Sequence, residues 1–173
     1  MADPRWKQGN YYGGDAPDNG LAVARMAAHI TYLSEEALTG KFGRNLQDRD
    51  AKSFGFDADF QVESYLRYQG SGFTRRFDAN SYIALVEAMN SHDVTRGRGP
   101  LAETLARVTA TCLVLGIDSD RLFPVETQHL LSAHLPRTIH GSEAVVISSP
   151  FGHDSFLIED DLVSPHLAEL LAS

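Results

Sequence analysis

The fold is indicated most clearly by one stretch of the sequence, Cys112-Leu113-Val114-Leu115-Gly116-Ile117, which ends in a polar loop that contains Asp120. A continuous run of apolar residues is typical of a strand that is covered on both faces of a parallel sheet. A second run, Ala144-Val145-Val146-Ile147-Ser148, leads into another loop, which contains His153. We therefore expect two buried parallel strands in this part of the chain.

Helical segments separate and follow these two strands. The sequence predicts one helix over about residues 125–135 and a last helix over about residues 160–171. The order strand, helix, strand, helix predicts an α/β fold with a parallel sheet. Two strands that are buried on both faces need neighbours, and the sequence offers no convincing third strand. We infer that the chain is the C-terminal part of a longer protein or one half of a split one.

The region before the first strand is expected to be helical. After an irregular entry segment, residues 1–17, apolar residues recur at helical spacing from Asp18 to a stop at Gly40. A polar loop is predicted over residues 41–58. Further helices are predicted over about residues 59–69, with Gly70 as the stop, and over about residues 78–92, with Asp78 as the N-cap. Pro100 suits the first turn of another helical segment.

Composition excludes several classes of function. The chain has 173 residues and a formal net charge of -8, so it lacks the basic surface that binds nucleic acid. No apolar run approaches the roughly 20 residues of a membrane span, and no signal peptide is recognised. The single Cys112 cannot form an internal disulfide, which favours a cytoplasmic protein. The histidines of the chain, such as His129 and His134, show no metal-binding motif, so no metal is expected.

Asp120 and His153 form the candidate catalytic pair. Both follow predicted strands, and the carboxyl ends of parallel strands meet at the ligand-binding edge of such a sheet. An aspartate that precedes a histidine matches the chain order of α/β-hydrolase triads. A strand-end aspartate that only caps a helix, and a solvated loop histidine, are the simpler alternatives. No Gly-x-Ser-x-Gly elbow occurs in the sequence, so the pair lacks a nucleophile.

The sequence around these residues resembles the homoserine O-acetyltransferase family along essentially the whole chain. The resemblance is carried by Asp3-Pro4-Arg5-Trp6, Gly9-Asn10-Tyr11-Tyr12, Gly20–Met26, His29–Ser34, Val62–Gly70, Arg76–Tyr82, His92-Asp93-Val94, Arg96-Gly97-Arg98-Gly99, Ser119-Asp120-Arg121-Leu122-Phe123-Pro124 and Gly152-His153-Asp154-Ser155-Phe156-Leu157. It covers only about the C-terminal half of a family member.

The resemblance implies an α/β-hydrolase fold with an entry segment (1–17), a helical lid region (18–108) and a C-terminal segment (109–173). It implies transfer of an acetyl group from acetyl-CoA, a co-substrate, to L-homoserine through an acyl-serine, in methionine biosynthesis. No permanently bound cofactor is expected. By position, Asp120 resembles the triad acid, His153 the triad base, and Asp154 the carboxylate that holds the substrate's ammonium group. The lid helices are expected to form a homodimer.

The resemblance also implies that the nucleophile, the oxyanion-hole amide and a substrate-binding arginine belong to an absent N-terminal half. We therefore expect the chain alone to be inactive. Three alternatives stay open. The first is a related acyltransferase whose acyl donor is succinyl-CoA or whose acceptor is serine. The same triad could belong to an esterase, or the chain could be a non-enzymatic dimerisation module.

Overall fold

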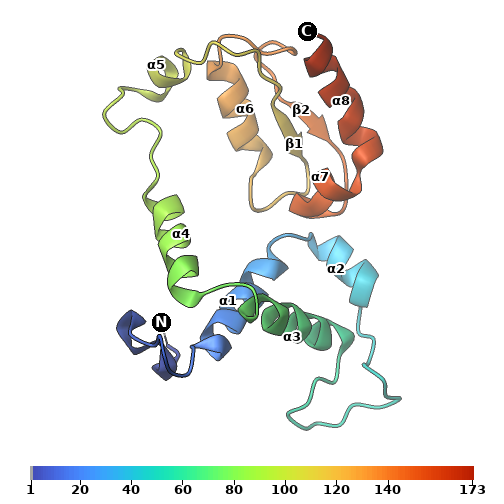
Figure 1. Ribbon diagram of the computed structural model, residues 1–173. Helices are drawn as coiled ribbons and strands as arrows, with labels where there is room; N and C mark the ends of the chain where they lie inside the picture. The colour runs from blue at the N-terminus through green and yellow to red at the C-terminus, as the bar shows by residue number, and fades with distance from the viewer. Residues whose placement is uncertain (1) are drawn as a thin grey trace. The chain divides into compact units, whose positions relative to one another are not determined.

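A computed structural model describes residues 2–173, which form two compact units (Figure 1). The first unit contains the residues up to Ile30 together with Thr39–His92, and the second contains Thr31–Leu38 together with Asp93–Ser173. In the described part of the chain, no helix is both long enough and apolar enough to cross a lipid bilayer.

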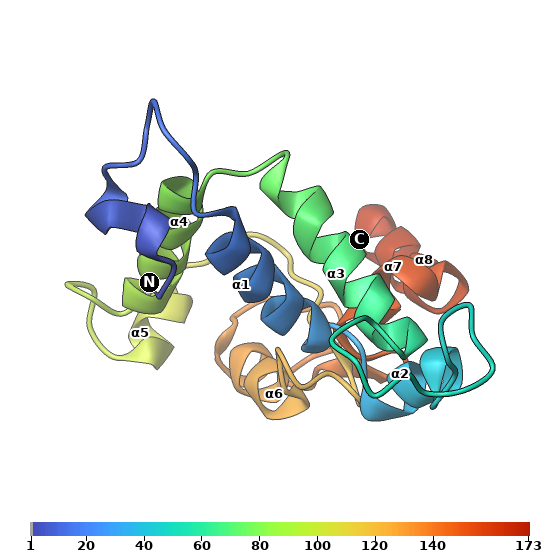
Figure 2. The same ribbon diagram turned by 90° about the horizontal axis from the view of Figure 1, so that it is seen from below.

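The first unit is built from helices α1 (Asp18–Ile30), α3 (Gln61–Thr74) and α4 (Ala79–Ser91), with a short 3₁₀ helix η1 (Pro4–Gly9). Helices α1 and α3 pack side by side (Figure 2). Tyr11, Leu21 and Ala79 form the buried core, and Trp6 and Tyr82 pack against it. The entry segment is therefore part of this unit's core. Apart from η1, its described residues are irregular, as the sequence predicts.

The predicted helix from Asp18 to Gly40 is wrong, because the chain breaks after Ile30 and a separate helix, α2 (Glu35–Phe42), follows. Ser34 begins this helix, and its hydroxyl accepts a hydrogen bond from the Ala37 N–H at 3.0 Å. A serine followed by acidic residues in the first turn is a favourable helix start. Gly40 lies inside α2 and does not end a helix.

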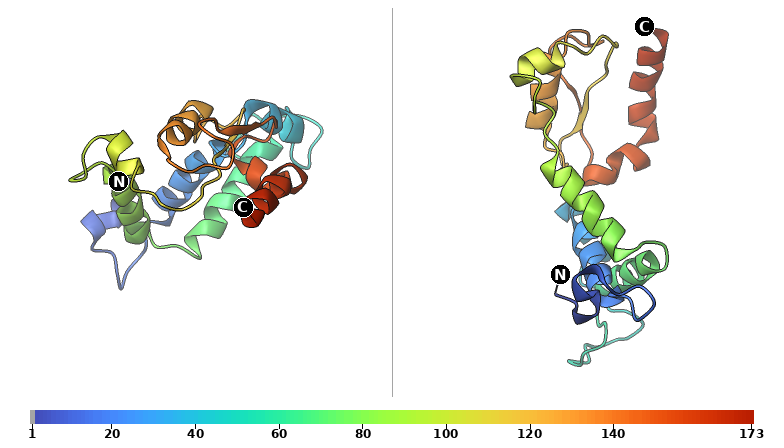
Figure 3. Two further views of the ribbon diagram at one scale, coloured as in Figure 1. Left: turned by 90° about the horizontal axis from the view of Figure 1, so that it is seen from above. Right: turned by 60° about the vertical axis from the view of Figure 1, so that its left-hand side comes forward.

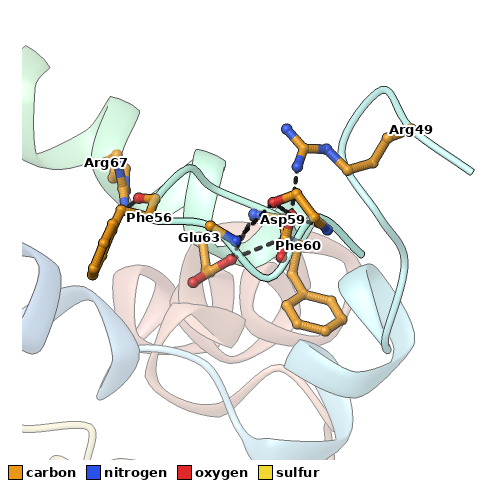
Figure 4. Close-up of polar contacts among 8 residues, drawn as sticks. Arg49, Phe56, Asp59, Phe60, Glu63 and Arg67 are labelled. Atoms are coloured by element: carbon orange, nitrogen blue, oxygen red, sulfur yellow. Dashed lines mark hydrogen bonds and ion pairs between the residues drawn. The ribbon is translucent and has the colours of Figure 1, made fainter. Parts of the chain in front are cut away.

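Gly70 is also not a helix stop, because α3 continues to Thr74. A Cβ atom on Gly70 would lie only 2.9 Å from the Ala22 carbonyl oxygen of α1, so the glycine permits close packing of the two helices. At the start of α3, the Glu63 carboxylate accepts hydrogen bonds from the N–H groups of Asp59 (2.9 Å) and Phe60 (3.0 Å) (Figure 4). The acidic side chain thus satisfies two backbone donors at the helix N-terminus.

The predicted helix over residues 78–92 is confirmed as α4. The Asp78 carboxylate caps it by accepting a hydrogen bond from the Ser81 N–H at 2.9 Å. The same carboxylate accepts hydrogen bonds from the hydroxyls of Tyr11 and Tyr12. Burial, and then the bond to Asp78, raise the pKa of Tyr11 to about 12. This cap therefore also anchors the entry segment.

The second unit contains a parallel pair of strands, β1 (Leu115–Ile117) and β2 (Val145–Ile147), in which Gly116 is paired with Val146. Helices α6 (Val125–His134) and α8 (Asp160–Ala172) lie on either side of the strands (Figure 1 and Figure 3). Val163 of α8 packs on Ile117 and Ile147. Short helices α5 (Leu101–Leu105), η2 (Gly152–Asp154) and α7 (Ser155–Ile158) complete this unit. The predicted strand–helix–strand–helix order is confirmed.

The strands are shorter and less covered than the sequence predicted. Cys112 makes only an isolated parallel bridge with Thr138, and regular pairing starts at Leu115. Val146 is 43% exposed, so the expectation that both strands are covered on both faces is wrong for β2. Among the residues that the structure describes, the sheet has only these two strands, so no third strand pairs with either of them.

Candidate active site

Asp120 follows β1 and is held by backbone groups. One carboxylate oxygen, Oδ1, accepts hydrogen bonds from the N–H groups of Leu122 (2.8 Å) and Phe123 (2.9 Å). Its side chain is only 6% exposed. The turn therefore fixes the carboxylate and leaves its second oxygen, Oδ2, for another donor.

His153 lies in η2, after β2, and supplies that donor. Its Nδ1 atom lies 2.8 Å from Asp120 Oδ2. The rings of Phe123, Phe156 and Tyr32 surround the imidazole at centroid distances of 5.0, 5.3 and 6.2 Å. The structure thus brings together the two residues that the sequence placed at the strand ends, 33 positions apart. Their catalytic roles stay a prediction.

Serine residues hold the loop that carries His153. The Ser119 hydroxyl donates to the Ser149 carbonyl oxygen and accepts a hydrogen bond from the Gly152 N–H at 3.0 Å. Ser155 is fully buried, and its hydroxyl lies 2.7 Å from the Gly152 carbonyl oxygen. These bonds connect the loop after β2 to the loop after β1, so the acid and the base share one local framework.

Asp118 strengthens the same connection. Its Oδ1 accepts a hydrogen bond from the Ser149 N–H at 3.1 Å, and its own N–H donates to the Ile147 carbonyl oxygen. Hydrogen bonds from the Ser148 side chain and the Ser149 backbone lower the pKa of the Asp118 carboxyl. Sequence reasoning gave this residue no role. Its position directly after a strand was the available signal.

The segment between α1 and α2 also supports the site, and the sequence did not predict this role. The Tyr32 carbonyl oxygen accepts a hydrogen bond from the Asp154 N–H at 3.1 Å, and the Ser34 hydroxyl donates to the Pro150 carbonyl oxygen. Gly152 has a φ of 68°, and a Cβ there would lie 2.7 Å from the Ser34 nitrogen. Only glycine allows this close approach of two backbone segments. The break in the helical pattern at residues 31–34 therefore supports the His153 loop.

Asp154 lies directly beside the pair, as its place in the chain requires, and is half-buried. Within residues 2–173, its carboxylate has no ion-pair partner. An acidic group in this position can accept a cationic group of a ligand. The binding role that the sequence suggested for Asp154 stays a prediction.

The arrangement suits proton transfer. An imidazole whose Nδ1 is hydrogen-bonded to a carboxylate has its tautomer and orientation fixed, so Nε2 can take a proton from a hydroxyl nucleophile and later return it. The carboxylate also stabilises the imidazolium that forms. The His153 side chain is 24% exposed, so the ring remains accessible. The pair can therefore serve as the acid and base of acyl transfer once a nucleophile is present.

Comparisons with known proteins identify the sequence relationship. No protein-family profile matches the chain. The homoserine O-acetyltransferase of Leifsonia xyli subsp. xyli is 52% identical over 99% of this chain, which covers 43% of that relative. The homoserine O-acetyltransferase of Caulobacter vibrioides is 52% identical over the whole chain, which covers 46% of it. The chain thus spans less than half the length of these curated relatives.

Solved structures support the fold. The crystal structure of homoserine O-acetyltransferase from Bacillus anthracis matches 99% of this chain with a TM-score of 0.83 at 22% identity, and the chain covers 45% of it. The crystal structure of esterase E22 matches 98% of the chain with a TM-score of 0.78 at 20% identity, and the chain covers 46% of it. The fold is therefore a portion of the α/β-hydrolase fold. In sequence, the chain corresponds over nearly all of its length to the C-terminal part of the homoserine O-acetyltransferases.

Proposed function

We propose that this chain supplies the acid and the base of an acyltransferase that moves an acetyl group from acetyl-CoA to the side-chain hydroxyl of L-homoserine. The observation that carries the proposal is the 2.8 Å contact between His153 Nδ1 and Asp120 Oδ2 beyond the ends of two parallel strands. The similarity to homoserine O-acetyltransferases supports the choice of donor and acceptor. Acetyl-CoA acts as a co-substrate, and no permanently bound cofactor takes part.

The proposed mechanism has two half-reactions. In the first, His153 takes the proton of a serine hydroxyl as its oxygen attacks the acetyl carbonyl, and the CoA sulfur leaves with a proton from the imidazolium. In the second, His153 takes the proton of the homoserine hydroxyl, which attacks the acyl-serine, and then returns a proton to the serine. Asp120 stabilises the imidazolium in both half-reactions.

Asp154 distinguishes this function from a second candidate, ester hydrolysis. An esterase has the same acid–base pair but uses water in the second half-reaction, and the fold is also similar to that of an esterase. An amino-acid acceptor has an ammonium group that needs an acidic partner, whereas water needs none. Asp154, a half-buried residue that follows His153 in the chain, favours the amino-acid acceptor.

The nucleophile comes from outside these 173 residues, because the sequence contains no Gly-x-Ser-x-Gly elbow. We therefore expect the isolated chain to be inactive. Helices α1, α3 and α4 are proposed to belong to a lid that pairs two subunits. Exposed apolar side chains on them support this, among them Val23, Tyr68, Leu85 and Met89. A cytoplasmic location belongs to the same proposal, since Cys112 is a free thiol.

Reconstitution tests the proposal. The chain is mixed with the N-terminal segment of the Leifsonia xyli relative that it does not match, and release of the CoA thiol is followed with acetyl-CoA and L-homoserine. We expect thiol release only with both segments present. His153→Ala should lower the rate by at least about 10³-fold, because the base is lost.

A matched control is His129→Ala, which removes an exposed histidine of α6 and should keep the rate. Full activity of His153→Ala would refute the assigned base. Equal thiol release with and without homoserine, and no loss in Asp154→Asn, would instead indicate the esterase.

A further inference from the structure

A second cluster of chemically active side chains lies in the second unit, away from the strand ends that carry Asp120 and His153. It consists of His140, His166 and Glu169, whose ligand atoms all lie within 4.8 Å of one another. His140 lies before β2, while the other two residues belong to α8. We propose that these three residues form a binding site for a divalent transition metal of the zinc type.

The donor set fits such an ion. Two imidazoles and one carboxylate are a ligand combination that holds zinc with one position left for water. His140 Nε2 lies 3.2 Å from Glu169 Oε2. Two ligands of a tetrahedral zinc ion, each about 2.0–2.1 Å from the metal, are about 3.3 Å apart. This pair of atoms therefore already has the separation that a shared ion requires.

The third ligand is placed by helix geometry. His166 and Glu169 are three positions apart on α8, so their side chains lie on the same face of the helix. The imidazoles of His140 and His166 lie edge to face, with ring centroids 5.8 Å apart and an interplanar angle of 79°. Histidine and glutamate side chains that are partly open to solvent can close the remaining gap by small rotamer changes.

The loop that carries His140 is fixed on both sides of that residue. The Ile139 N–H donates to the Cys112 carbonyl oxygen at 3.0 Å. On the other side, the Gly141 carbonyl oxygen accepts hydrogen bonds from the hydroxyls of Thr138 and Ser132. Ser132 is only 1% exposed, so this anchor is part of the core. A metal at His140 would therefore bind to a fixed loop and connect it to α8.

A hydrogen-bonded pair between His140 and Glu169 is the simpler interpretation, and it gives no role to His166. The two interpretations therefore differ at His166. Titration of the 173-residue chain with Zn²⁺ by calorimetry, and with Co²⁺ by visible absorption, measures binding and coordination. We expect one ion per chain, and a Co²⁺ spectrum with the intensity of a four-coordinate site.

Variants decide the question. His166→Ala, His140→Ala and Glu169→Gln should each weaken Zn²⁺ binding by at least about tenfold, because even the loss of a group that only orients a metal ligand costs about that much. His129→Ala removes an exposed histidine outside the cluster and should leave the affinity unchanged. Circular dichroism of each variant checks that the fold is kept.

An affinity that His166→Ala leaves unchanged would overturn the proposal and leave the hydrogen-bonded pair. So would an equal loss in His129→Ala, which would indicate unspecific binding to surface histidines. This outcome is independent of the acyltransferase proposal, because the titration needs neither a nucleophile nor a substrate.

Discussion

Replacing Gly152 by alanine tests the contact that supports the His153 loop. Gly152 has a positive φ of 68°, in which side chains with a Cβ atom are strained. The new Cβ would lie 2.7 Å from the Ser34 nitrogen and 3.0 Å from the Tyr32 carbonyl oxygen. Both are backbone atoms, so the clash cannot be relieved by a side-chain rotation.

The expected loss of stability has two parts. The left-handed conformation costs about 1–2 kcal/mol for a residue with a Cβ atom. Forcing a methyl group into a packed contact costs a further ~1–3 kcal/mol. Gly152→Ala should therefore lower the free energy of unfolding by about 2–5 kcal/mol. Gly97→Ala measures the cost of the left-handed conformation alone, because Gly97 has a φ of 70° and no atom lies within 4 Å of a Cβ placed there.

Urea unfolding followed by circular dichroism measures both variants. Gly97→Ala should lose only about 1–2 kcal/mol, so the difference between the variants reports the contact with residues 32–34. If Gly152→Ala is no less stable than Gly97→Ala, the close approach does not exist in the protein. In the reconstituted enzyme, Gly152→Ala should also slow thiol release, because it displaces the neighbouring His153.

Three further changes have defined outcomes. Asp120→Asn keeps one acceptor for the turn but no longer stabilises the imidazolium, so kcat of the reconstituted enzyme should fall by about 10³–10⁴-fold. Ser34→Ala removes the N-cap of α2 and the bond to Pro150, and should cost about 1–2 kcal/mol in urea unfolding. Because the pKa of Tyr11 is raised from 10.0 to about 12, its contribution to stability is complete below pH 10 and is lost as the pH rises through about 12. Tyr11→Phe should abolish that loss in a pH series of thermal melts, and a wild-type stability that is flat over this range would contradict the assignment.

The acid–base pair could be predicted from the sequence because parallel strands impose a simple geometry. Apolar runs that end at Ile117 and Ile147 predict strands, and the residues after both must meet at one edge. Nothing about side-chain orientation is needed to place Asp120 near His153. The prediction failed in the length of the strands and in the burial of β2, since pairing and coverage depend on partners that the sequence of one strand does not specify.

The break at Ser34 could not be found from periodicity. Apolar residues continue in phase from α1 into the next helix, so a pattern of spacing alone joins the two helices. Ser34 followed by Glu35 and Glu36 was the local signal of a new helix start. What fixes the break is tertiary: the Ser34 hydroxyl also bonds to Pro150, which lies 116 positions away.

Gly70 is a second position at which a tertiary contact, and not the local sequence pattern, decides the structure. A glycine near the end of a helical pattern usually stops the helix. Here the helix continues, because the absence of a side chain allows α3 to approach the backbone of α1 at Ala22. Close packing of this kind offsets the low helix propensity of glycine, and the sequence of one helix carries no information about its neighbour.

Contacts within the second unit set the geometry of the Asp120–His153 pair. They do not shield the pair from water. Backbone N–H groups hold the aspartate, and serine hydroxyls hold the histidine loop. However, Phe123 and Phe156, which flank the imidazole, are each about half exposed. Catalysis by preorganised polar groups needs an environment from which water is excluded. An added segment must therefore contribute more than a serine: it has to cover these two rings, and a peptide that carries only the nucleophile elbow should restore little activity.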